Sequence, residues 1–244
     1  MKSKETLEEI SMKKMTFSIF VILLAALVHC SEKKIPDTGI VTFLKGEAFV
    51  TKQGKKSALK FGEEIISGDL IETGNASVVI VTFAAGESAA EIQSNSKFYI
   101  SLYNDKKADL ELQSGNVWFA VNQKGKKDFS LTSPTAVAGV RGTKFFTFQV
   151  DAETFGTCHC EGKVHYTVKE NNEATDNVSD HMVVVRKGKS ITIEPEEYHE
   201  LFPGNSTNHA HSEIETSTLG KARNVSPEYR KKLFERIESK FAAL

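Results

Sequence analysis

The stretch EIISGDLIETGNASVVIVTF, residues 64–83, contains the features that decide the fold of this chain. Ser67-Gly68-Asp69 and Thr73-Gly74-Asn75 have the composition of tight turns, in which glycine supplies a positive φ and an Asp or Asn side chain bonds the local backbone. The apolar, β-branched run 77–83 that follows is typical of a strand. The stretch therefore predicts short strands joined by glycine turns, with Gly68, Asp69 and Gly74 as structural turn residues.

The same pattern of short apolar runs closed by turn residues extends from residue 39 to about residue 194. A hairpin is predicted between 181–185 and 190–193, whereas the polar stretch 169–180 is predicted to be a loop. Because no strand pattern alternates with a helical one, Rossmann-type α/β folds are excluded. The sequence predicts an all-β fold, either an antiparallel sandwich or a rolled, solenoid-like sheet. The other predicted strands are 40–44, 48–50, 97–100, 108–112, 117–121, 145–150, 155–160 and 163–168.

The C-terminal part of the chain has a different pattern. Residues 195–225 are predicted to be a loop-rich segment with room for one short helix. Residues 226–244 are predicted to form an amphipathic helix, with Ser226 as the N-cap and Pro227 at the first helical position. Its apolar face is expected to pack on the sheet, with partner binding as the alternative. That face consists of Tyr229, Leu233, Ile237, Phe241 and Leu244.

The first residues predict export from the cytoplasm. Two lysines precede the apolar run 15–28, which is too short for a comfortable membrane span and is typical of a signal peptide, here residues 1–29. Cys30 follows directly and resembles the lipidated cysteine of a bacterial lipobox, with residues 30–38 as a polar tether. His29 departs from the small residue usual before that cysteine, so ordinary signal cleavage or a retained membrane helix stay open. Translation starting at Met12 or Met15 is also open, because residues 1–11 are acidic.

Composition and charge limit the classes of function. The chain has 244 residues, and its 31 Lys and Arg against 32 Asp and Glu give a formal charge of −1. A general nucleic-acid binder needs clustered excess positive charge, so no nucleic-acid partner is expected. The chain also lacks G-x-S-x-G, H-E-x-x-H and a glycine-rich phosphate loop. The sequence therefore predicts a protein that is not an enzyme.

Three motifs occur in a fixed order along the chain. They are residues 61–77, 112–117 and 133–145, the last reading SPTAVAGVRGTKF. The first is similar to G-x-x-L-x-x-G-D-x-I-x-T-G-x-x-S, and the last is similar to T-P-x-A-x-x-x-V-R-G-T-x-F. Together they resemble the FecR family, the periplasmic domain of ferric-citrate regulators. The resemblance spans about residues 39–168, within an expected FecR-like domain at 39–194.

The resemblance implies a role in recognition or sensing. Typical members join this domain to a transmembrane helix and a cytoplasmic anti-sigma segment, and they relay transporter occupancy to a sigma factor. Because only eleven residues precede the leader region here, the cytoplasmic half is expected to be lacking. The resemblance then implies a non-catalytic module of the cell envelope, held to a bacterial membrane on its periplasmic or surface side by a lipid anchor. Its expected partner is an envelope protein, a glycan or a small ligand.

Gly139, Arg141 and Gly142 are predicted to form a tight bend within the last motif. Arg141 is expected to anchor the bend by bonding backbone carbonyls or a carboxylate, because its planar fork suits that task. A G-x-x-G loop binding phosphate or nucleic acid is the alternative, which the missing positive charge disfavours.

Histidines and cysteines concentrate late in the chain and suggest an alternative function. Cys158, Cys160 and all six histidines after His29 lie between residues 158 and 211. If Glu161-Gly162 is a two-residue hairpin turn, Cys160 pairs with Lys163 and Cys158 pairs with His165. Cys158, Cys160 and His165 then share one face, whereas a more apolar face with Phe155, Thr157, His159, Val164, Tyr166 and Val168 is expected to be the core.

Such a cluster would lack one ligand for tetrahedral zinc, which His181 or His211 is expected to supply. No cofactor other than this zinc is expected. A disulfide or redox-labile pair and inert structural cysteines are the competing hypotheses. A bridge between residues two apart in a flat strand is strained, although an oxidising compartment favours one. Metal handling or redox sensitivity therefore remains the alternative to a recognition module.

Overall fold

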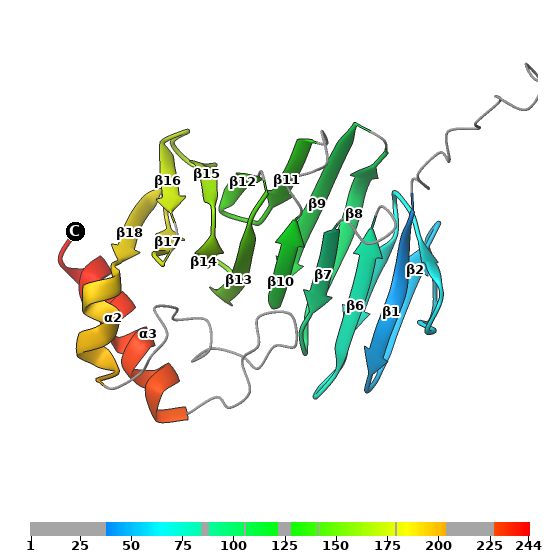
Figure 1. Cartoon of the computed structure of the whole chain (residues 1–244), viewed down its shortest axis with the longest axis horizontal. Helices are drawn as coiled ribbons and strands as arrows, with labels where there is room; N and C mark the ends of the chain where they lie inside the picture. Colours follow the sequence, from blue (N-terminus) through cyan, green and yellow to red (C-terminus); the bar gives the residue numbers. More distant parts are fainter. Residues whose placement is uncertain are drawn as a thin grey trace, which may run out of the picture. The chain divides into compact units, whose positions relative to one another are not determined.

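The computed structural model describes residues 38–83, 88–104, 106–121, 128–140, 142–178, 180–203 and 227–244. Its strands form two nine-stranded sheets, and two helices follow them in the chain (Figure 1). The all-β prediction is confirmed, and so is the C-terminal helix.

Sheet A contains, in spatial order, β18 (Lys189–Ile193), β17 (Met182–Arg186), β14 (Thr154–Glu161), β13 (Lys144–Asp151), β10 (Asn116–Val121), β7 (Ser88–Ile92), β6 (Val78–Phe83), β1 (Gly39–Lys45) and β4 (Glu64–Ile65). Sheet B contains β16 (Ala174–Val178), β15 (Lys163–Val168), β12 (Ala136–Val140), β11 (Asp128–Thr132), β9 (Lys107–Ser114), β8 (Lys97–Tyr103), β5 (Leu70–Thr73), β2 (Ala48–Lys52) and β3 (Lys55–Ala58). The helices are α2 (Pro195–Leu201) and α3 (Pro227–Ala242).

The chain passes back and forth between the two sheets. It forms one strand or one hairpin in a sheet, crosses to the other sheet, and so advances along both from β1 and β2 to β18, as the colours of Figure 1 follow. Neighbouring strands pair antiparallel except β9 and β11, which are parallel. The fold therefore combines the two predicted alternatives: it is a sandwich whose strands succeed one another as in a solenoid.

Glycines with positive φ mark three of the crossings between sheets. Gly46, Gly115 and Gly162 have φ values of +77°, +87° and +88°. A Cβ at each would lie within 2.2–2.6 Å of a serine or threonine side chain on a neighbouring segment. Glycine is therefore required at these positions for two reasons. The positive φ disfavours other residues, and a side chain would clash with the neighbouring crossing.

The core lies between the sheets, and a second apolar cluster lies on the outer face of sheet A. Strands β13, β14 and β17 are buried on both faces. Trp118, Phe148 and Val184 belong to the outer cluster, which α2 and α3 cover with Phe202, Leu233, Ile237 and other residues. The sequence prediction that the apolar face of the last helix packs on the sheet is confirmed for Leu233 and Ile237, which are 0% and 1% exposed, whereas Leu244 is 62% exposed.

Two charged groups hold the helices to each other and to sheet A. The Glu197 carboxylate of α2 accepts hydrogen bonds from Lys240 at 2.5 Å and Arg236 at 3.0 Å, both in α3. Arg186, at the end of β17, forms a two-point ion pair with Glu238 of α3. The α3 helix is therefore held both to α2 and to sheet A.

Two predictions of local structure are wrong. The polar stretch 169–180 is not only a loop, because it contains strand β16, which pairs with β15. The segment Glu161-Gly162 is not a hairpin turn, because β14 pairs with β13 and β17 in sheet A, whereas β15 pairs with β12 and β16 in sheet B. The turn is one of the crossings between sheets.

Candidate functional site

A single row of polar residues crosses five strands on the outer face of sheet B. The strand register aligns one residue from each of β9, β11, β12, β15 and β16. In order they are Asp109, Ser130, Gly139, His165 and Asp176. We call these five residues the polar row.

The two halves of the polar row have the same arrangement around the central glycine. On one side the Ser130 hydroxyl donates to Asp109 Oδ1 at 2.6 Å. On the other side His165 Nδ1 is 2.8 Å from Asp176 Oδ1. Each carboxylate is also paired with a lysine, Lys107 at 2.8 Å from Asp109 and Lys163 at 2.5 Å from Asp176. Hydrogen-bonding side chains are therefore held in place on both sides of a bare backbone position.

Both carboxylates of the row are ionised at neutral pH. Burial alone would raise the pKa of Asp109, but hydrogen bonds from Lys107 and Ser130 outweigh it and leave that pKa below its usual value. Hydrogen bonds from Lys163 and then His165 lower the pKa of Asp176. The row therefore offers fixed negative charges beside lysine ammonium groups, with no net excess of either sign.

Gly139 is a glycine that the fold does not require. A Cβ there would meet only the His165 carbonyl oxygen, at 3.8 Å, which is an ordinary contact distance. Its φ is not in the left-handed region, and a glycine within a strand weakens that strand. Glycine in a strand often marks a place where a ligand or another backbone approaches closely. Gly139 therefore leaves the backbone of β12 open to close approach from outside.

The polar row is suited to recognition more than to covalent chemistry. Ser130 and His165 lie on either side of β12, so their strands are about 10 Å apart at the usual spacing. A serine nucleophile needs its base within hydrogen-bond reach, about 3 Å. The Ser130 hydroxyl donates instead to Asp109.

The structure does not bring Cys158 and His165 together. Cys158 lies in β14 of sheet A, 1% exposed in the apolar cluster beneath the helices. His165 lies in β15 of sheet B and is exposed beside Asp176. The shared face predicted for them is wrong because the hairpin that would create it is a crossing. The six side chains predicted for the core are all 2% exposed or less, but they belong to strands of two different sheets, and Cys158 on the other face of β14 is buried as well.

The remaining candidate ligands are spread over the chain. Cys160 lies in β14, and His181 precedes β17 and is partly buried. Among the described residues, no group of three His, Cys, Asp or Glu side chains could hold a metal ion. Cys30, Arg141 and His211 lie outside the described residues.

The predicted turn residues differ in what they do. Gly68 has a φ of +92°, and Asp69 accepts a hydrogen bond from the Ile66 amide at 2.9 Å, both as expected of a turn. Gly142 also has a positive φ, +61°. Gly139 lies within β12 and not in a bend. At Gly74 the turn prediction misplaced the positive φ, which Ala76 adopts.

Sequence reasoning missed Asp109, Ser130 and Asp176. The alternation of exposed and buried residues could have placed the first two on outer strand faces. Their alignment across five strands depends on register and on the parallel pairing of β9 with β11, which no local pattern contains.

Part of the chain matches a known protein family. A family model described as FecR protein matches residues 69–189. No functionally curated protein matches the chain. Two crystal structures of a candidate anti-sigma factor from Parabacteroides distasonis ATCC 8503 are similar to it, with 18% and 17% identity and TM-scores of 0.44 and 0.45. The matches cover 51% and 55% of this chain but only 59% and 64% of those chains. In the part of the chain that the structure describes, no helix has the length and apolar character needed to cross a membrane.

Proposed function

We propose that this chain, whose residues 69–189 match the FecR family model, is a signalling module of the cell envelope that recognises a partner protein. The contact surface is the outer face of sheet B around the polar row. All five strands that carry the row lie within the matched domain.

The observation that carries this proposal is the combination of Gly139 with its neighbours. The glycine exposes a strip of backbone, and fixed hydrogen-bonding groups flank it at Ser130 and His165. An approaching polypeptide can pack against such a strip and exchange hydrogen bonds with both sides. The paired charges on either side would lie in the polar, solvent-accessible rim of such an interface.

The two outer faces of the sandwich support the choice of sheet B. Sheet A carries α2 and α3 over its apolar outer cluster. In sheet B the outward side chains of β9, β11 and β15 are half-buried or exposed, and they alternate with buried ones. The outward side chains of β9, β11 and β15 are therefore available to a partner, whereas the helices cover the outer apolar cluster of sheet A.

Photo-crosslinking in intact cells tests the proposal. A photoreactive amino acid replaces Val137, which is half-buried two residues before Gly139 and so on the same face. The matched control places it at Glu235, an exposed position of α3 on the opposite sheet. We expect one discrete protein adduct from position 137 and none from position 235. Adducts formed mainly from position 235, or no protein adduct from position 137, would contradict the proposed surface.

We further propose that Cys30 carries a lipid that holds the module to a membrane. The support is the position of Cys30, directly after the apolar leader run and before a polar tether. Replacing Cys30 with Ala should move the protein from the membrane fraction to the soluble fraction. A variant that still sediments with membranes would contradict lipidation and favour a retained leader helix.

A further inference from the structure

Four turns meet at one end of the sandwich, and the strand register explains why. In sheet A, Thr154 pairs with Arg186, which places the β13–β14 turn beside the β17–β18 turn. In sheet B, Ala136 pairs with Val168, which places the β11–β12 turn beside the β15–β16 turn. The Asn171 side-chain amide donates to the Gly188 carbonyl at 2.7 Å and so joins the two pairs of turns.

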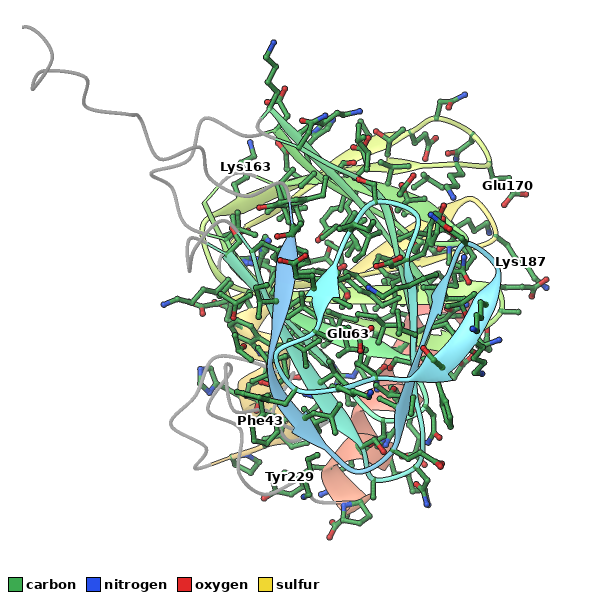
Figure 2. All side chains as sticks on the ribbon, turned by 90° about the vertical axis from the view of Figure 1, so that its right-hand side faces the viewer. Phe43, Glu63, Lys163, Glu170, Lys187 and Tyr229 are labelled. Carbon is green, nitrogen blue, oxygen red and sulfur yellow. The ribbon has the colours of Figure 1, made fainter. Side chains whose placement is uncertain are left out.

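A cavity of about 510 Å³ lies between these turns. Its volume falls in the range of small-molecule sites, roughly 300–1,000 Å³. Both sheets contribute to its lining, which includes Pro134, Thr135, Ala152, Lys169, Glu170 and Lys187. Figure 2 shows Glu170 and Lys187 on the same side of the domain, opposite Lys163. The cavity is therefore distinct from the polar row.

Two opposite charges in the cavity have no counter-ion. The Lys169 ammonium donates to the Ser133 carbonyl at 2.5 Å, which satisfies one of its three N–H groups but does not neutralise its charge. Among the described residues, no ion pair or side-chain hydrogen bond is found for Glu170 and no acidic partner for Lys169, and both side chains are exposed to solvent. Lys187 differs, because it is paired with Glu153 at 2.9 Å.

The cavity thus presents one ammonium and one carboxylate, with which a ligand can pair at the same time. Both side chains are exposed, so water solvates them when the cavity holds no ligand.

We propose that this cavity binds a small zwitterion, an amino acid or a dipeptide with a free ammonium and a free carboxylate. The ligand carboxylate pairs with Lys169, and the ligand ammonium pairs with Glu170. Pro134 and Ala152 provide apolar contact for a small side chain. A ligand with only one charge can pair with only one of the two side chains.

Isothermal titration calorimetry on the full-length protein tests this site with four probes. They are alanine, alanyl-alanine, N-acetyl-alanyl-alanine, which has no ammonium, and alanyl-alanine amide, which has no carboxylate. We expect saturable binding of alanine or alanyl-alanine, and the tighter of the two identifies the ligand size. Each capped analogue should bind about tenfold more weakly or worse, because it loses a hydrogen-bonded ion pair.

Two variants distinguish binding in this cavity from binding elsewhere on the protein. Glu170→Gln should weaken binding by about tenfold, whereas Glu173→Gln, an exposed acid in the same loop that does not line the cavity, should leave it unchanged. Melting temperatures of both variants confirm that they are folded. The proposal is overturned if neither alanine nor alanyl-alanine binds, if a capped analogue binds as tightly as its parent, or if both variants bind alike.

Discussion

Gly156 and Gly139 are both strand glycines, but they meet different surroundings. A Cβ on Gly156 would lie 2.2 Å from the Phe148 ring, which is 1% exposed and lies near Phe234 of α3. A Cβ on Gly139 would meet nothing closer than 3.8 Å. Packing therefore explains the first glycine and does not explain the second, and this contrast is the reason for assigning Gly139 to recognition.

Gly156→Ala is expected to destabilise the domain. The new methyl group forces Phe148 or the strand to move within a packed cluster, which typically costs about 1–3 kcal/mol. For a chain of this size that corresponds to a Tm lower by roughly 3–10 °C. Thermal unfolding followed by circular dichroism measures the change. An unchanged Tm would mean that the Phe148 ring relaxes without cost and that the cluster is loosely packed.

Turn chemistry at single residues was only partly readable from sequence. Gly68 and Asp69 behave as their residue types predict. At 73–77 the positive φ falls on Ala76, while Gly74 brings its amide to the Glu47 carbonyl at 2.8 Å. Glycine serves there for close approach, and a single sequence cannot distinguish that use from a positive φ.

At the scale of elements, α3 is held by buried apolar side chains and by charged groups. Leu233 and Ile237 are buried against the outer cluster of sheet A, and Arg186 fixes Glu238 while stacking 4.6 Å from the Phe241 ring. These two kinds of contact respond to different changes, so they can be tested separately.

Leu233→Ala is expected to lower the free energy of unfolding by about 2–5 kcal/mol, because it removes a fully buried side chain and leaves a cavity. The control is Lys231→Ala on the exposed side of the same helix, where the change should stay within about 0.5 kcal/mol. Urea unfolding gives both values. Equal, small effects of the two variants would show that α3 is not packed on the sheet.

The hydrogen-bonded carboxylate of Glu197 should make the stability of the domain depend on pH. Burial alone would raise the pKa of Glu197, but hydrogen bonds from Lys240, the Glu194 amide and Arg236 lower it below its ordinary value of 4.5. A lowered folded-state pKa stabilises the protein above about pH 4.5, and this stabilisation is lost as the pH falls through the folded-state value.

Unfolding of the wild type and of Glu197→Gln across a pH series measures this effect. The wild type should be more stable at pH 7, and its advantage should shrink steadily below pH 4.5. A difference that stays constant over the whole series would indicate that the Glu197 carboxylate contributes no charge-dependent stability.

The positions of the strands and the alternation of their side chains were predictable from the sequence, whereas the pairing of each strand with its neighbours was not. The strand 163–168 and the hairpin across Lys187-Gly188 are found as expected. The hairpin prediction at Glu161-Gly162 was wrong because a glycine between two short strands suits a hairpin and a crossing between sheets equally well. Only the packing of Gly162 on Thr143, a contact between distant segments, distinguishes them. The polar strand β16 was missed because Ala174, Thr175 and Asp176 are exposed or half-buried and its sequence lacks an apolar alternation.

At the scale of the whole domain, the outer faces of the two sheets differ. Sheet A supplies the second apolar cluster, which the helices α2 and α3 cover. Sheet B presents the polar row, and the turns of both sheets enclose the cavity at one end. The family match and the all-β architecture could be anticipated from motifs, but the polar row arises only when five strands are brought into register.

The central claim is that a partner contacts sheet B at Gly139, and a bulky residue at that position tests it most directly. The measurement is the yield of the protein adduct from position 137 in a Gly139→Trp background, together with the Tm of the same variant. A Cβ at Gly139 meets nothing closer than 3.8 Å and the position is exposed, so we expect the Tm to stay close to that of the parent. We expect the adduct yield to fall by about tenfold or more, as for loss of a central contact. An undiminished adduct from a variant with an unchanged Tm would contradict the account.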